Sequence, residues 1–90
     1  MVSPKARILC AEDDAETREL IKLILGGEGY DVITTDSPQQ ALRFAQSEPF
    51  DLYLIDNWMP GLSGDELTRK IREYDSETPI LFYSRRRARV

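Results

Sequence analysis

The sequence predicts a single α/β domain built on a parallel sheet. Short apolar runs alternate with longer segments that carry apolar residues at helical spacing, as in strands joined by crossover helices. Four strand signals alternate strictly with three helix signals, which requires parallel strands and right-handed crossovers. Two strand signals also end in acidic residues, where open α/β sheets place their ligand sites. Ninety residues with 41% apolar and 31% charged side chains suit one globular domain.

The first strand is expected over residues 6–11 and the first helix directly after it. The strand ends at the acidic group Glu12-Asp13-Asp14. Asp14 is a suitable N-cap, because its carboxylate can accept a backbone N–H group of the first turn. The helix is expected to run to about Leu25, where Gly26-Gly27 would stop it. Its apolar stripe consists of Leu20, Ile21, Ile24 and Leu25.

The second strand and second helix follow the same alternation. Residues 30–35 are rich in β-branched and aromatic types, which predicts a strand. Ser37 and Gln40 have the spacing of a capping box, and Pro38 suits the first helical position. The helix is expected to end at Glu48-Pro49, since a residue before proline avoids the helical conformation.

The third strand is expected over residues 50–55, where it runs into Asp56 and a Pro-Gly loop. Ser63 and Glu66 form a second capping-box pair and predict the start of the third helix. Residues 80–83 are a final apolar run and predict the fourth strand, which ends at Ser84. The third helix is expected to present Leu67, Ile71 and Tyr74 on one face.

The acidic strand ends predict a cation site. If the first and third strands are neighbours, Glu12, Asp13 and Asp56 converge on one crevice. Two carboxylates about 4 Å apart repel by roughly 4 kcal/mol at an effective dielectric near 20. Mg²⁺ suits such a site, because it takes a few carboxylate oxygens and keeps several of its waters. Two other interpretations stay open: a first helical turn rich in acids, and a turn-forming Asp56 before Pro-Gly.

Three motifs in sequence order resemble the receiver domain of bacterial two-component response regulators. They are the strand end Ile-Leu-x-x-Glu-Asp-Asp, the loop Asp-x-x-Met-Pro-Gly and the strand Thr-Pro-Ile-x-x-x-Ser. The resemblance covers residues 6–84. The resemblance implies a flavodoxin-like doubly wound parallel sheet with strand order 2-1-3-4-5. This chain is expected to form an incomplete version, with four strands, three helices and no fifth βα unit.

The resemblance also implies a role for each site residue. Asp56 matches the phosphoacceptor, which takes a phosphoryl group from a sensor histidine kinase. Glu12 and Asp13 match the acidic pair that holds Mg²⁺ with Asp56, and the backbone carbonyl of Trp58 matches a further ligand. Ser84 matches the switch hydroxyl that bonds the phosphoryl oxygen. The chain would then be a phosphoacceptor in a phosphorelay and not an enzyme. The alternatives are a Ser84 that simply ends a strand and a Trp58 ring that is an ordinary partly buried aromatic.

The chain departs from the family pattern in two places. The family's lysine after the fifth strand has no counterpart among the lysines of this chain, which are Lys5, Lys22 and Lys70. Arg85 follows Ser84 where the family usually has a small residue, so that it either crowds the site or supplies the missing charge. An alternative function is therefore a receiver-fold dimerisation or docking module that works without phosphorylation. A phosphohydrolase is set aside, because Trp58 occupies the position of that class's second aspartate.

The absence of a fifth unit predicts a homodimer. The fourth strand is expected to become a sheet edge, and the first helix is expected to expose part of its apolar face. A few hundred Å² of such surface corresponds to several kcal/mol at roughly 25 cal/mol per Å². The homodimer is expected through edge pairing or helix packing.

Charge and composition indicate which kinds of partner and which cellular location to expect. Four of the twelve basic residues lie in the last six positions, so residues 1–84 carry eight basic and sixteen acidic side chains. A domain with this surplus of acidic side chains is not expected to bind nucleic acid. The basic tail at 85–90 is either solvated or a ligand for phosphate-rich partners. No membrane-spanning run or secretory signal is expected, and Cys10 is expected to be a small buried hydrophobe. A cytoplasmic location is the expectation.

Overall fold

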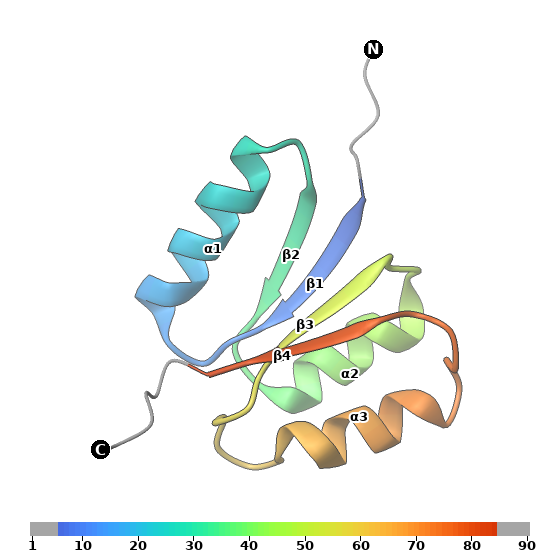
Figure 1. Ribbon diagram of the computed structural model, residues 1–90. Helices are drawn as coiled ribbons and strands as arrows, with labels where there is room; N and C mark the ends of the chain where they lie inside the picture. Colours follow the sequence, from blue (N-terminus) through green and yellow to red (C-terminus); the bar gives the residue numbers. More distant parts are fainter. Residues whose placement is uncertain (1–5, 85–90) are drawn as a thin grey trace.

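The structure is a computed structural model that describes residues 6–84. It is one parallel sheet of order β2-β1-β3-β4 with three helices (Figure 1). This order matches the first four strands of the order 2-1-3-4-5, so the prediction of a flavodoxin-like doubly wound sheet is confirmed. Arg85 and the basic tail lie outside the described residues. The elements are β1 (Arg7–Ala11), α1 (Ala15–Gly27), β2 (Asp31–Thr35), α2 (Pro38–Ser47), β3 (Leu52–Asp56), α3 (Gly64–Arg72) and β4 (Ile80–Tyr83).

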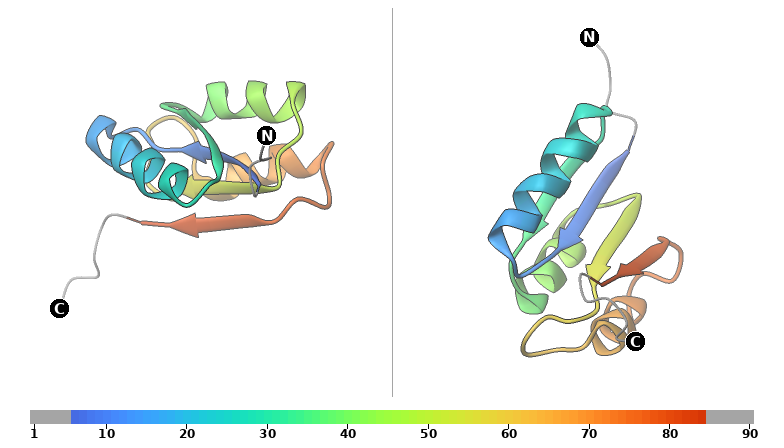
Figure 2. Two further views of the ribbon diagram at one scale, coloured as in Figure 1. Left: turned by 90° about the horizontal axis from the view of Figure 1, so that it is seen from above. Right: turned by 60° about the vertical axis from the view of Figure 1, so that its left-hand side comes forward.

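The helices cover both faces of the sheet, with α1 on one face and α2 and α3 on the other (Figures 1 and 2). Alternate side chains of β1 and β3 point into the core under α2 and α3, because successive residues of a strand face opposite sides. Leu9, Tyr53 and Ile55 belong to this core and are at most 2% exposed. The side of the sheet that faces α1 holds Cys10, which is fully buried as predicted. In the described part of the chain, no helix has the length and apolar character needed to cross a membrane.

Two helices begin as their capping signals predict. The backbone N–H of Thr17 donates to the Asp14 carboxylate at 2.9 Å, so Asp14 is the N-cap of α1. Ser63 and Glu66 form a complete capping box at the start of α3, in which each side chain accepts the other residue's backbone N–H. Both caps stand at the end of a loop that follows a strand, so they fix where the chain turns back along the sheet.

Several boundaries differ from the predictions. Ser37 caps α2, but the Gln40 side chain accepts the N–H of Asp36 at 3.2 Å, so the reciprocal half of the predicted capping box is wrong. Gly26-Gly27 are the last residues of α1, not its stop signal, and the left-handed backbone belongs to Gly29 (φ 98°). The strand β3 starts two residues later than predicted and includes Asp56.

The apolar stripe of α1 is more exposed than helical periodicity suggests. None of its residues is buried, and Leu20, Leu23 and Ile24 are 55%, 74% and 56% exposed. The expectation that part of this face meets water is therefore confirmed. Ile21 and Leu25 are half-buried, and they share an apolar hollow with Leu54 and Tyr83.

A glycine brings α3 close to the sheet edge. Gly64 is buried at the first position of α3, and a Cβ there would lie 2.9 Å from the Phe82 ring. The same Cβ would lie 2.7 Å from the side-chain oxygen of Asn57. The absence of a side chain at Gly64 thus lets the start of α3 pack against both β4 and the loop after Asp56.

The connection from α3 to β4 is organised around Asp75. One carboxylate oxygen accepts the Tyr53 hydroxyl at 2.8 Å, and the other accepts the backbone N–H groups of Glu77 and Thr78, both at 3.1 Å. The side-chain and backbone hydrogen bonds from Thr78, followed by those from Tyr53 and Glu77, hold the pKa of Asp75 well below its usual range. The carboxylate therefore contributes to stability only when it is ionised.

Replacing Asp75 with Asn should lower the free energy of unfolding at pH 7 by about 1 kcal/mol, since a charged acceptor is lost. The folded-state pKa is depressed, so this contribution is present above the unfolded pKa near 3.9 and is lost as pH falls through the folded value. Urea titrations at pH 7 and pH 3 should show a smaller gap between the two proteins at the lower pH, because the unfolded chain is already largely protonated there. Asp36→Asn, at an exposed position, is the control. An equal gap at both pH values would contradict the role of the ionised carboxylate.

Candidate functional site

Three carboxylates meet at the end of the sheet where β1 and β3 stop. Ala11 pairs with Ile55 in the parallel register, so Glu12 and Asp56 leave the sheet side by side. One oxygen from each of Glu12, Asp13 and Asp56 lies within 4.8 Å of the others. Glu12 is 0% and Asp56 1% exposed, whereas Asp13 is partly exposed. The fold thus concentrates negative charge in a largely buried position.

Hydrogen bonds fix the orientation of the two buried carboxylates. Glu12 accepts the backbone N–H of Asp14 at Oε2 (2.9 Å) and the hydroxyl of Tyr83 at Oε1. Asp56 accepts the backbone N–H of Trp58 at Oδ1 (3.0 Å). The donors come from the turn after β1, from β4 and from the loop after β3. Three segments far apart in the sequence therefore hold the acidic cluster together.

Arg18 brings a positive charge to the same turn. Its guanidinium Nη1 donates to the backbone carbonyls of Glu12 at 3.0 Å and Asp13 at 3.1 Å. Sequence reasoning missed this residue, because an arginine in the second turn of a helix usually lies on a solvated face. The contact satisfies two carbonyls of the β1–α1 turn and places a cation beside the carboxylates.

Tyr83 is the second residue that sequence reasoning missed. Burial raises the pKa of its hydroxyl, and the hydrogen bond to Glu12 raises it further, so Tyr83 remains a donor. The neighbouring Cys10 thiol has its pKa raised to about 11 by burial, which a hydrogen bond with Tyr83 only partly offsets. Cys10 therefore stays protonated and is not a reactive thiol.

The remaining predicted residues surround this cluster. Tyr83 pairs with Asp56 across β3 and β4, so Ser84 lies one residue beyond the partner of Asp56, at the same end of the sheet. Ser84 is exposed, and the Trp58 residue is 57% exposed. The turn that contains Trp58 closes at Gly61, whose φ of 99° favours glycine.

The donor set fits a hard divalent cation. Carboxylate oxygens are the ligands that Mg²⁺ and Ca²⁺ prefer, and a partly exposed edge at Asp13 leaves room for water ligands. The chain contains no histidine, and its one cysteine is protonated and buried, so the ligands typical of zinc sites are lacking. With a cation to offset the charge, a buried carboxylate such as Asp56 has the chemistry of a phosphoryl acceptor.

Comparison with known proteins assigns the chain to a family. The model of the response regulator receiver domain matches residues 8–89. The chain is 39% identical over 77 residues to the sensor histidine kinase GacS of Pseudomonas protegens, a match covering 82% of this chain and 8% of GacS. It is 36% identical over 78 residues to the cell cycle transcriptional regulator CtrA of Caulobacter vibrioides, covering 87% of this chain and 34% of CtrA. The chain thus spans between 8% and 34% of the length of these relatives.

Solved structures show the same fold. The response regulator TrrA of Thermotoga maritima, in complex with Mg²⁺-BeF, has a TM-score of 0.83 and 36% identity over 87% of this chain and 68% of its own. A structure of the histidine kinase ThkA in complex with TrrA gives a TM-score of 0.82 and 35% identity, covering 88% of this chain and 68% of the matched one. From the sheet order, the motifs and these matches, the chain belongs to the response regulator receiver domain family.

Proposed function

We propose that this receiver domain accepts a phosphoryl group on Asp56 from a sensor histidine kinase, with Mg²⁺ at the same site. The observation that carries the proposal is the convergence of three carboxylate oxygens within 4.8 Å at the carboxyl end of two adjacent strands. Such a cluster is unfavourable without a counter-charge and suits phosphoryl transfer with one. The domain would serve as an acceptor in a phosphorelay and not as an enzyme with a separate substrate.

Each residue has a distinct part in the proposed reaction. Glu12, Asp13, Asp56 and the backbone carbonyl of Trp58 would hold Mg²⁺, which when bound offsets the charge of the incoming phosphate. The N–H of Trp58 holds the Asp56 carboxylate in one orientation for attack on phosphorus. The bond between phosphorus and the donor histidine breaks as the acyl phosphate forms. Ser84 would then donate its hydroxyl to a phosphoryl oxygen.

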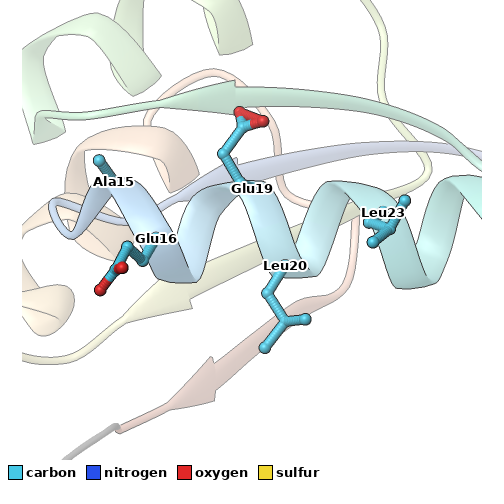
Figure 3. A pocket seen from close by; sticks show the side chains of 5 residues that line it. All are labelled: Ala15, Glu16, Glu19, Leu20 and Leu23. Carbon is cyan, nitrogen blue, oxygen red and sulfur yellow. The ribbon is translucent and has the colours of Figure 1, made fainter.

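The surface of α1 is the proposed contact for the kinase. TrrA, which has the same fold, forms a complex with the histidine kinase ThkA, and this supports a kinase as the partner here. A shallow hollow on α1 is lined by exposed leucines and by acidic side chains (Figure 3). It begins at the start of α1, which directly follows the acidic turn of the site. Such a surface suits a partner helix that presents apolar and basic residues. The residues of the hollow are Ala15, Glu16, Glu19, Leu20 and Leu23.

Replacing Asp56 with Asn should abolish phosphorylation, because the amide cannot act as the nucleophile. After incubation with acetyl phosphate and Mg²⁺, intact mass spectrometry should find one phosphoryl group on the parent and none on the variant. Asp36→Asn, at an exposed position outside the cluster, should be modified like the parent. An adduct on Asp56→Asn, or on a different residue of the parent, would refute Asp56 as the acceptor.

A second candidate function is self-association that needs no phosphorylation. It is favoured by the exposed side chains Leu20 and Ile24 on α1 and by Leu81, which is 55% exposed on the edge strand β4. A second copy could cover these side chains and pair with the edge. This homodimer, like the cytoplasmic location, stays a prediction.

Ile24→Lys and Leu81→Lys should each shift a homodimer toward monomer, since both place a charge on the apolar surface. Multi-angle light scattering over a micromolar concentration series would measure the mass. Gln46→Lys, at an exposed position on α2, adds the same single positive charge and is the control. A parent that stays monomeric throughout the series would rule out this second function and leave the phosphoacceptor function intact.

A further inference from the structure

We infer that Tyr83 is a positioning residue for the proposed metal ligand Glu12 and links the cation site to the end of β4. This inference rests on the proposed Mg²⁺ site and adds a residue to it. In the motif Thr-Pro-Ile-x-x-x-Ser, Tyr83 occupies an unspecified position, so nothing in the motif assigns it a role.

With the hydrogen bond from Tyr83, both oxygens of the Glu12 carboxylate accept a hydrogen bond. The Tyr83 hydroxyl donates to Oε1, and the Asp14 N–H donates to Oε2 at 2.9 Å. Glu12 is fully buried, so its conformation is set by these protein donors in place of bulk water. A glutamate has three side-chain torsions, and a donor on each oxygen restricts them to one arrangement that faces Asp13 and Asp56.

The tyrosine ring is itself held in place by packing. It lines the apolar hollow between α1 and the sheet, together with Ile21, Leu25 and Leu54. The Tyr83 carbonyl accepts the N–H of Asn57 at 2.9 Å, which fastens the backbone of the same residue to the loop after Asp56. The hydroxyl is therefore presented to Glu12 from a fixed position, as a supporting donor must be.

Supporting donors of this kind tune metal affinity. A ligating carboxylate is usually oriented by a hydrogen bond from outside the coordination sphere, and loss of that bond typically weakens metal binding by about 10- to 100-fold. The carboxylate oxygen has a second lone pair, so a hydroxyl donor and a cation can share it. Tyr83 thus favours cation binding without being a ligand.

The same bond couples the cation site to the switch position. Tyr83 pairs with Asp56 in the sheet and is covalently followed by Ser84. A displacement of Glu12 toward a bound cation would be transmitted through the hydroxyl to the end of β4.

Tyr83→Phe should raise the Kd for Mg²⁺ about tenfold, measured by isothermal titration calorimetry and by the fluorescence of Trp58, the single tryptophan of the chain. Tyr53→Phe is the matched control, because it removes a hydroxyl that donates to another carboxylate, Asp75, away from the cluster. Its Kd should stay within twofold of the parent. In a Glu12→Gln background, Tyr83→Phe should have no further effect, since the residue acts through Glu12.

The outcomes separate this inference from the proposed function. A parent that does not bind Mg²⁺ refutes both. If the parent binds Mg²⁺ and Tyr83→Phe binds it equally well or more tightly, the inference is refuted and the proposed function stands. If Tyr83→Phe does not fold, 3-fluorotyrosine at position 83 of the otherwise unchanged chain replaces it. Its ¹⁹F signal should shift on addition of Mg²⁺ while a label at Tyr53 does not, and an unshifted signal at 83 would overturn the inference.

Discussion

Electrostatic repulsion among three carboxylates is the constraint on which the rest of this structure depends. Parallel pairing of β1 with β3 brings Glu12 and Asp56 to one edge, and burial removes the water that would otherwise screen them. The fold responds with donors from separate segments: the hydroxyl of Tyr83, backbone N–H groups of two turns and the guanidinium of Arg18 on the carbonyls nearby. The acidic groups that favour a cation also accept hydrogen bonds from β4 and from the turns after β1 and β3, and these bonds connect the three strands at one end.

The two ends of the sheet are stabilised by different chemistry. At the acidic end, three carboxyl groups are gathered close together, and the described donors reduce the electrostatic cost of this arrangement. At the opposite end, the carboxylate of Asp75 accepts a tyrosine hydroxyl and two backbone N–H groups, and its charge is fully accommodated. Binding of a cation to the folded state alone would therefore stabilise the domain as well as prepare it for chemistry. The unfavourable charge and the proposed function would then both originate in the same three carboxyl groups.

Local signals made much of this fold predictable. The alternation of strands and helices, the caps at Asp14 and Ser63, and the acidic strand ends follow from patterns within a few residues. The strand order is instead implied by the resemblance to the receiver family. The contact of Tyr83 with Glu12 spans 71 positions and depends on β4 lying beside β3, so neither residue signals it alone. The same holds for Arg18, whose spacing is that of any helical arginine. Helical periodicity identified the apolar face of α1, but burial depends on which neighbours cover that face, and periodicity contains no information about them.

The exposure of α1 has a consequence for how the domain opens. A helix without a single buried residue contributes little to the cooperative core, so its amide hydrogens exchange through local openings that leave the sheet intact. The N-cap of this helix is Asp14, and the backbone N–H of Asp14 also donates to the Glu12 carboxylate. A helix with no buried residue is thus attached to the acidic cluster. Each opening of the helix start loosens one side of the acidic cluster, and a bound cation, by holding that cluster, would slow the opening.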